Sequence, residues 1–415
     1  MDLKSWNPWW DSGSVPQELL GRPRQAFEDL KQAFSSGRIL MLKGPRRAGK
    51  TTLMHQLADW LVKERGPDNV LYVSLDDVQF LEASIQDVYL EFVRLMNSED
   101  AVLLLDEVQE KQGWARWAKT QYDRKAARIV VSGSTKHLVS REHSKYLTGR
   151  VLEKTVYPLS FEEFLGFKGF NAPRILGRED EKRLEHYQEE FLSVGGFPEV
   201  VLSPNALRKQ MLIEYSESLV ARDVVPKVEG DYRKAFAVFR YLSTAVGTPV
   251  SNNSLRKALA IGTETASKYL KVFRDAFLVF SSEYYSRSAK LVGRMPKKYY
   301  VMDNGLLSAV ANPGKGMLLE NAVATELLKK GYKPFYWKKK GECDFVLNTS
   351  LGRVGIQATI DPSKQREANA LAEAVKELSL DKTVIVTLSA SDTNRGAIPF
   401  WRFALKIFTE IGEPL

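Results

Sequence analysis

Residues 44–51 read Gly-Pro-Arg-Arg-Ala-Gly-Lys-Thr, and this stretch decides the fold predicted for the first part of the chain. It matches the pattern Gly-x-x-x-x-Gly-Lys-Ser/Thr, which needs a strand before it and a helix after it. Both are predicted here, because residues 39–42 are apolar and residues 52–64 place apolar side chains at helical spacing. The stretch and its flanks therefore predict a loop that binds phosphate.

The spacing within this loop follows from the chemistry of a nucleotide. Glycines let successive backbone N–H groups turn toward the β-phosphate, and the N-terminus of the following helix adds its dipole. Lys50 is expected to reach the β- and γ-phosphates, and the hydroxyl of Thr51 is expected to bind Mg²⁺. The residues predicted to bind ATP are Gly44, Pro45, Arg46, Arg47, Ala48, Gly49, Lys50, Thr51 and Thr52.

Two carboxylates follow the third predicted strand, residues 101–105. Because ligands of open α/β sheets bind at the carboxyl ends of the strands, Asp106 and Glu107 are expected beside the phosphate loop. Asp106 is predicted to hold the metal, and Glu107 to orient the attacking water. The alternative is that these two acids merely open a surface loop, and the phosphate loop upstream argues against it.

Two more side chains are candidates for catalysis. Ser134 follows a fourth predicted strand, residues 129–131, and its hydroxyl is expected near the γ-phosphate or the attacking water. A plain polar turn is an equal alternative there. Arg150 is a candidate finger that neutralises charge on the transferred phosphoryl group, with a solvated surface arginine as the alternative. Strands alternate with helices through this region, which predicts a parallel α/β sheet.

The order of these motifs resembles that of the archaeal and bacterial AAA+-type P-loop ATPases that carry a C-terminal domain of unknown function. Further segments that fit are Leu-Thr-Gly-Arg at 147–150, Tyr-Pro-Leu-Ser-Phe-Glu-Glu-Phe at 157–164, Gly-Gly-Phe-Pro-Glu at 195–199 and Arg-Asp-Val at 222–224. The resemblance implies an AAA+-like core and supports Ser134 as a sensor and Arg150 as a finger. In this class the finger usually completes a neighbour's site, which implies a homo-oligomer. In some relatives the nucleotide is a switch and turnover is slow.

Four domains are predicted along the chain. Residues 1–158 form the ATPase core and residues 159–235, which are helical by pattern, form a lid. Residues 236–300 are expected to be a winged helix, which relatives are thought to carry. The resemblance implies a restriction-endonuclease-like domain for residues 301–415.

Most of the positive charge of the chain lies in residues 236–300. This segment has eleven basic and three acidic residues, a net +8, whereas the whole chain has a formal charge of +9. Such concentrated charge is typical of a protein that binds a polyanion, most often nucleic acid. A basic solvated face on a packing module is the alternative.

The same segment predicts a helix–turn–helix with a wing. Residues 254–260 and 263–277 are expected helices, and residues 278–285 and 298–302 are the expected strands of the wing. The apolar stripe predicted for the second helix consists of Ala266, Tyr269, Leu270, Phe273 and Phe277. Basic residues off this stripe and at the wing tip are the candidate DNA contacts, namely Lys268, Lys271, Arg274, Arg287, Lys290, Arg294 and Lys297.

The active form of the nuclease-like domain needs a glutamate on its first helix, an aspartate on a strand and Glu-x-Lys on the next strand. Glu320 and Asp344 occupy the first two positions, but Gln357 and Thr359 stand where the last glutamate and the lysine would be. Metal-assisted hydrolysis depends on a complete set of ligands. We therefore predict a nuclease-like fold without cleavage, which still binds DNA through the lysines at 338–340.

The composition fits a soluble protein of the cytoplasm. Of 415 residues, 44% are hydrophobic and 27% are charged, and no apolar run is long enough to span a bilayer. A single cysteine, Cys343, excludes an internal disulfide and is typical of a reducing compartment. The sequence thus predicts a Mg²⁺-dependent ATPase that binds DNA and couples nucleotide state to oligomer rearrangement. The alternatives are a signalling or defence switch that binds a protein, and an active nuclease.

Overall fold

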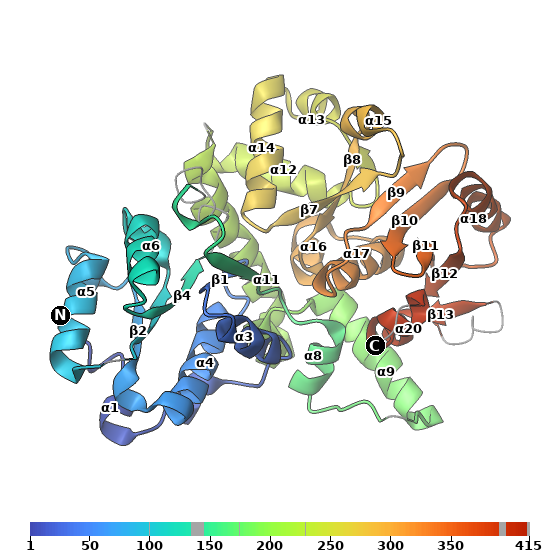
Figure 1. The fold of residues 1–415 in the computed structure, drawn as a ribbon. Coiled ribbons are helices and arrows are strands. Elements are labelled where there is room, and N and C mark those ends of the chain that lie inside the picture. The colour runs from blue at the N-terminus through green and yellow to red at the C-terminus, as the bar shows by residue number, and fades with distance from the viewer. Residues whose placement is uncertain (99, 134–144, 174, 229, 390–395, 413–415) are drawn as a thin grey trace. The chain divides into compact units, whose positions relative to one another are not determined.

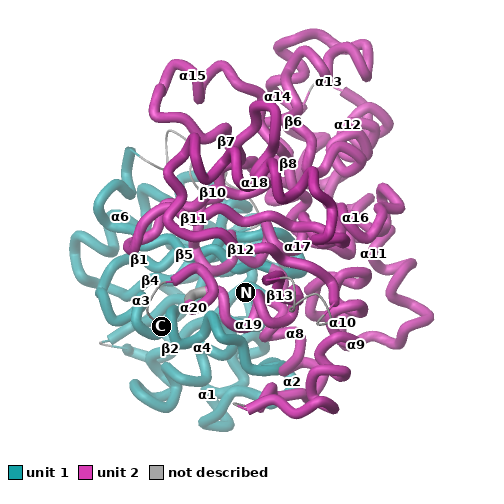
Figure 2. The backbone as a smooth tube through the Cα atoms, turned by 90° about the vertical axis from the view of Figure 1, so that its right-hand side faces the viewer, with its two compact units in different colours: residues 1–157 teal, residues 158–415 magenta. Residues whose placement is uncertain are grey.

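The computed structural model describes residues 1–98, 100–133, 145–173, 175–228, 230–389 and 396–412 (Figure 1). The chain divides into two compact units, residues 1–157 and residues 158–415, which are coloured separately in Figure 2. Among the described helices, none combines the length and the apolar character that a membrane crossing requires.

The first unit is built on a parallel sheet of five strands in the order β2-β3-β4-β1-β5. The strands are β1 (Ile39–Lys43), β2 (Val70–Ser74), β3 (Val102–Asp106), β4 (Arg128–Gly133) and β5 (Val151–Thr155). The helices are α1 (Trp9–Ser12), α2 (Gln17–Leu20), α3 (Ala26–Ser35), α4 (Lys50–Arg65), α5 (Ile85–Met96) and α6 (Trp114–Arg124). The parallel α/β sheet predicted from the sequence is therefore confirmed.

Strand β5 was not predicted, and its position explains why. It lies at the edge of the sheet and pairs with β1 alone. Its side chains are only partly buried and include Glu153 and Lys154. An edge strand that is partly exposed to solvent lacks the continuous apolar run by which a buried strand is recognised in a sequence.

The N-terminal tryptophans close the core of this unit. Trp9 and Trp10 are both buried, and each indole N–H donates to the carbonyl of Val70 at 3.0 Å. Buried tryptophans normally find such a partner for the indole N–H. Their role is thus to anchor the N-terminal segment against β2.

The second unit contains an eight-stranded mixed sheet in the order β13-β12-β11-β10-β9-β7-β8-β6. Its strands are β6 (Pro249–Val250), β7 (Val279–Tyr284), β8 (Lys297–Val301), β9 (Phe335–Lys338), β10 (Glu342–Thr349), β11 (Gly352–Ala358), β12 (Lys382–Thr387) and β13 (Ala397–Pro399). Its helices are α8 (Phe161–Phe167), α9 (Arg178–Val194), α10 (Pro198–Leu202), α11 (Asn205–Leu219), α12 (Tyr232–Thr244), α13 (Asn252–Leu259), α14 (Thr263–Asp275), α15 (Ala289–Arg294), α16 (Asn304–Ala311), α17 (Lys315–Lys329), α18 (Gln365–Leu378), α19 (Phe400–Leu405) and α20 (Ile407–Ile411).

The two strands expected to form a wing belong to this large sheet. β7 pairs antiparallel with β8 on one side and parallel with β9 on the other. One buried apolar cluster extends from Leu159 to Ile411, and it includes the four residues of the predicted stripe that lie on α14, Ala266, Tyr269, Leu270 and Phe273. The expected loop at the tip of the wing contains the short helix α15. The division into lid, winged helix and nuclease-like domain stays a prediction.

The two glycines of the Gly-Gly-Phe-Pro-Glu segment pack against a buried carboxylate. Asp303 is 2% exposed and accepts hydrogen bonds from the backbone N–H of Gly196 at 2.7 Å and of Gly305 at 2.8 Å. Gly195 has φ 75°, and a Cβ there would lie 2.0 Å from Oδ1 of Asp303. Glycine is required at position 195 by both its backbone conformation and this close approach.

We expect Asp303→Ala to destabilise the protein by about 2–4 kcal/mol, because it leaves buried backbone N–H groups without an acceptor. Urea unfolding followed by circular dichroism measures the free energy of unfolding. Glu214→Ala is a control, since Glu214 is exposed on α11. An Asp303→Ala variant as stable as this control would contradict the role given to the carboxylate.

Candidate functional site

The phosphate loop runs between β1 and α4 with the geometry that its glycines allow. Gly44 has φ 151°, and a Cβ at this position would lie 2.0 Å from the carbonyl oxygen of Val156. Lys50, the first residue of α4, is buried and donates from Nζ to the carbonyls of Gly44 and Pro45, each at 3.0 Å. The loop therefore curls around its lysine ammonium, the group predicted to bind phosphate.

The other predicted loop residues differ in exposure. Ala48 is buried, Arg46 and Thr52 are partly buried, and Arg47 is exposed with φ 65°. A left-handed backbone at a residue other than glycine is uncommon and is found at ligand-binding turns.

Asp106, at the end of β3, is the centre of the polar contacts beside this loop. Its side chain is nearly fully buried, and Thr51 donates from Oγ1 to its Oδ2 at 2.6 Å. Tyr72 donates to the same oxygen at 3.2 Å, and Ser132 donates to Oδ1. β4 lies between β1 and β3, so the parallel order brings the carboxyl ends of all three together. Thr51 and Asp106 thus meet as the sequence predicted.

Glu107 begins the turn after β3 and lies in the field of Lys50. Its φ is 50°, its backbone N–H donates to Oδ1 of Asp106 at 3.0 Å, and Gln109 donates to its carboxylate. Burial raises the pKa of Glu107, while Lys50 opposes the shift. The structure therefore gives Glu107 the environment of a base with an elevated pKa.

Sequence reasoning missed two aromatic residues beside Asp106. The Tyr72 and His55 rings lie 4.3 Å apart. Burial, reinforced by Asp106, raises the pKa of Tyr72, and burial lowers the pKa of His55. Tyr72 lies in an apolar strand and reads as core, because no local pattern shows that its hydroxyl reaches Asp106.

Arg24 was also missed, although it is buried and holds the loop in place. Its guanidinium donates to the carbonyl of Ala48 at 2.8 Å and to the carbonyl of Tyr157 at 3.0 Å. One buried guanidinium thus links a carbonyl of the phosphate loop to the carbonyl of Tyr157 and holds the loop in position. Nothing in the sequence around Arg24 distinguishes it from a surface arginine.

The two remaining catalytic candidates do not join this group. Ser134 lies outside the described residues. Arg150 donates from Nε to Oδ1 of Asp123 at 2.7 Å and holds the pKa of that carboxyl at about 2. Within the described residues, the other acceptor of its guanidinium is the carbonyl of Thr148. The role of finger stays a prediction.

The basic face expected on the second unit is smaller than the sequence suggested. Lys268 and Lys271 are exposed on α14, and Arg274 is partly buried and donates to the carbonyl of Leu270. Exposed basic side chains on and beside α15 are Arg287, Lys290 and Arg294. Lys297 is paired with Glu283 at 2.7 Å.

Lys298, which the charge count included in this basic segment, is fully buried among carboxylates. Its burial removes one charge from the +8 that favoured a nucleic-acid partner. Two of the three lysines at 338–340 form ion pairs within the protein. Lys338 pairs with Glu342 and Lys339 pairs with Glu377, each at 2.6 Å.

Known families match three parts of this chain. Residues 36–165, which contain the phosphate loop, Asp106 and Glu107, match a family described as an AAA domain. The match supports an AAA-like ATPase family. Nucleotide binding by the AAA domain is supported by the same match. Residues 185–315 and 315–404 match two families, each described as a domain of unknown function (DUF8612 and DUF4143).

Relatives that match most of the chain are described as uncharacterised proteins. An uncharacterised protein of Methanocaldococcus jannaschii is 28% identical over 94% of this chain and 93% of its own length. An uncharacterised protein of Haemophilus influenzae is 28% identical over 83% of this chain and 88% of its own. The chromosomal replication initiator protein DnaA of a Ruegeria species is 33% identical, but over only 36% of this chain and 35% of its own.

Solved structures with a similar arrangement are distant in sequence. A Walker-type ATPase of Pyrococcus abyssi has a TM-score of 0.46 and 12% identity, and the match covers 72% of this chain and 97% of that chain. The Orc1 protein of Aeropyrum pernix in complex with DNA has a TM-score of 0.33 and 13% identity, covering 72% and 95%. Similarity at this level assigns no function.

Proposed function

We propose that this protein is a Mg²⁺-dependent ATPase whose AAA domain hydrolyses ATP. The observation that carries the proposal is the set of contacts around Asp106, which joins Thr51 at the phosphate loop to the turn that holds Glu107. Lys50, buried within the loop, supplies the positive charge that the β- and γ-phosphates need. The polar groups required for hydrolysis thus come from two strand ends of one sheet, Lys50 and Thr51 after β1 and Asp106 and Glu107 at the end of β3.

The oxygens of Thr51 and Asp106 fit a site for Mg²⁺. They lie 2.6 Å apart. Neighbouring oxygens on an octahedral Mg²⁺ lie about 3.0 Å apart, given metal–oxygen bonds of about 2.1 Å. A small shift would therefore let both face one cation, and Thr51 is exposed enough to be reached from solvent. When bound, Mg²⁺ would neutralise charge on the phosphates.

Side chains and backbone groups of this chain would bind the phosphates, activate the water and neutralise the developing charge. The Lys50 ammonium would exchange its hydrogen bonds to the carbonyls of Gly44 and Pro45 for hydrogen bonds to phosphate oxygens. Backbone N–H groups of the loop would bind the β-phosphate. Glu107 would hold the attacking water and accept its proton. Arg150 would leave Asp123 to neutralise charge on the transferred group, in its own subunit or in a neighbour.

ATP turnover with and without double-stranded DNA, on protein whose oligomeric state is measured in parallel, tests this function. We expect turnover that requires Mg²⁺ and rises with DNA and with oligomer formation. Absence of ATP turnover in every oligomeric state would reject the ATPase. Tight retention of ADP with slow turnover and no response to DNA would favour the nucleotide switch that binds a protein.

We further propose that the exposed basic side chains of α14 and α15 bind the DNA backbone. The predicted stripe of α14 is buried, which leaves Lys268 and Lys271 on its exposed side. Arg287, Lys290 and Arg294 are exposed around α15. These charges suit phosphate contacts, which give affinity without base specificity.

Lys268→Ala/Lys271→Ala is expected to weaken DNA binding and reduce its salt dependence. Each lost phosphate contact should lower the slope of log affinity against log salt by roughly 1, so the double variant should lose about 2. Fluorescence anisotropy over a salt series measures the slope. The matched control is Lys209→Ala/Lys376→Ala, two exposed lysines on α11 and α18. Equal slopes for the two double variants would show that α14 does not contact DNA.

A further inference from the structure

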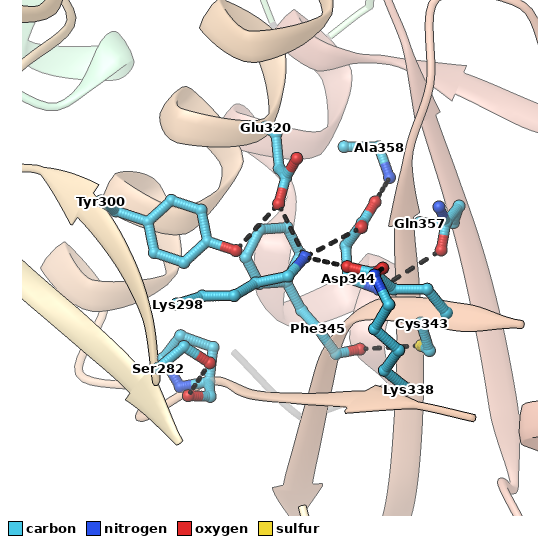
Figure 3. Close-up of polar contacts among 12 residues, drawn as sticks. Ser282, Lys298, Tyr300, Glu320, Lys338, Cys343, Asp344, Phe345, Gln357 and Ala358 are labelled. Atoms are coloured by element: carbon cyan, nitrogen blue, oxygen red, sulfur yellow. Dashed lines mark hydrogen bonds and ion pairs between the residues drawn. The ribbon is translucent and has the colours of Figure 1, made fainter. Parts of the chain in front are cut away.

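A buried lysine occupies the middle of a carboxylate cluster in the second unit. The cluster is defined here as Glu320 on α17 with Glu342 and Asp344 on β10. Figure 3 shows Glu320 and Asp344 on either side of Lys298. Nζ of Lys298 lies 2.7 Å from Glu342, 3.0 Å from Glu320 and 3.3 Å from Asp344. A lysine ammonium has three donors, so each carboxylate of the cluster takes one.

Strand β8 brings Lys298 to this place. Lys297 and Lys298 point to opposite faces, as neighbouring strand residues do, and Lys297 pairs with Glu283 at the surface. The Lys298 side chain has no exposed area. Tyr300, two residues further on, follows Lys298 to the same side and donates to Glu320 at 2.9 Å. The lysine and the tyrosine together hold Glu320.

The other polar groups of the nuclease-like motif are also occupied by protein partners. The second oxygen of Asp344 accepts from the backbone N–H of Ala358 at 3.0 Å. The Gln357 side chain accepts from the backbone N–H of Asp344 at 3.3 Å and donates to Glu367 at 2.8 Å. It therefore links β11 to α18 and presents no carboxylate to the cluster.

Thr359 forms its side-chain hydrogen bonds with Asp361, which is not part of the cluster. Its hydroxyl donates to the backbone carbonyl of Asp361 at 3.3 Å and accepts from the backbone N–H of Asp361 at 3.2 Å. The positive charge of the cluster thus comes from β8 and not from the position where the nuclease motif would carry its lysine.

The charges of the cluster favour a permanent cation at its centre. Burial and the neighbouring Glu320 raise the pKa of Asp344 to about 7, against the opposing effect of Lys298. Burial alone would lower the pKa of Lys298, but Tyr300 and the carboxylates raise it well above its ordinary value. The cluster borders a cavity of about 670 Å³, so solutes can approach its carboxylates.

We propose that Lys298 is a built-in cation that occupies the carboxylates where a divalent metal would otherwise bind, and thereby closes this cavity to metal. The proposal does not depend on ATP hydrolysis by the first unit. Mg²⁺ and Ca²⁺ require several oxygen ligands at 2.0–2.6 Å, and here the ammonium already takes one oxygen of each carboxylate. A divalent ion among these carboxylates would lie beside the like charge of the buried ammonium, and this repulsion opposes its binding.

Lys298→Met tests the proposal, because methionine keeps most of the side-chain volume and removes the charge. Without metal, we expect its melting temperature to fall on the order of 10 °C, since buried Asp344 and partly buried Glu320 and Glu342 lose the cation that they share. Millimolar Ca²⁺ should restore several degrees to Lys298→Met and leave the natural protein unchanged. The measurement uses the full chain without nucleotide. Lys298→Met/Glu320→Gln, which lacks a ligand, should lose most of the response.

A second comparison uses only proteins that keep the lysine. Calorimetric titrations of Ca²⁺ into the natural protein and into Glu320→Gln should be identical, because neither has an open cluster. Any metal site at Asp106 contributes equally to both and cancels. A site present in the natural protein and lost in Glu320→Gln would overturn the proposal. A folded Lys298→Met that gains neither stability nor a Ca²⁺ site would overturn it as well.

Discussion

Replacing Glu107 with glutamine is expected to lower ATP turnover by roughly a hundredfold to ten-thousandfold while leaving ATP binding close to that of the natural protein. Proton transfer by a positioned side chain contributes this much to catalysis, and glutamine cannot accept the proton of the attacking water. Glutamine keeps the size of the side chain, so the turn after β3 is preserved. Turnover is measured by phosphate release, and binding by calorimetry with ATP and Mg²⁺.

Glu110→Gln is the matched control, because Glu110 lies three residues further along the same turn and is exposed. Its turnover should equal that of the natural protein. Burial raises the pKa of Glu107, so turnover should fall with acidity at a pH above the ordinary range of a glutamate. The carboxylate is the active form, so a raised pKa means that protonation inactivates Glu107 at a higher pH than it would inactivate an ordinary glutamate. Full turnover by Glu107→Gln would exclude this residue as the base.

Replacing Lys50 with alanine is expected to weaken ATP binding by roughly thirtyfold or more, which corresponds to at least about 2 kcal/mol. Truncation of one partner of a buried, hydrogen-bonded charge pair has effects of this size. In the structure, Lys50 contacts loop carbonyls, and the loop N–H groups alone would have to hold the phosphates in the variant.

Lys63→Ala serves as the control on the same helix, since Lys63 is exposed and pairs with Asp59 at 2.6 Å. Binding of a fluorescent ATP analogue gives the affinities, and circular dichroism checks that each variant folds. Equal affinities for Lys50→Ala and Lys63→Ala would exclude the loop as the phosphate site.

The phosphate loop and the ends of the buried strands were predictable, because the information lies within a few residues. The glycines at 44 and 49, the apolar run before them and the helical spacing after them are contiguous. Asp106 was predictable because a fully apolar strand ends at it. The parallel order of the strands then brings it to Thr51 without further information.

Two further partners of Asp106 could not be predicted, because they come from other strands through tertiary packing: Tyr72 reads as a core residue and Ser132 as part of a polar turn. Arg24, which contacts the phosphate loop and not Asp106, reads as a surface cation. Lys298 is the clearest case. A count of charges places it on a basic face, whereas the pleat of β8 buries it among three carboxylates.

The pairing of β7 with β9 has a practical consequence for dissecting this protein. A chain cut after residue 300, at a boundary drawn from the sequence, would strip β9 from β7 and leave that strand with an open hydrogen-bonding edge. It would also remove Glu320 and Asp344, two of the carboxylates that pair with the Lys298 ammonium. Exposed strand edges recruit other chains. The helices proposed to bind DNA are therefore best studied with the C-terminal strands still attached.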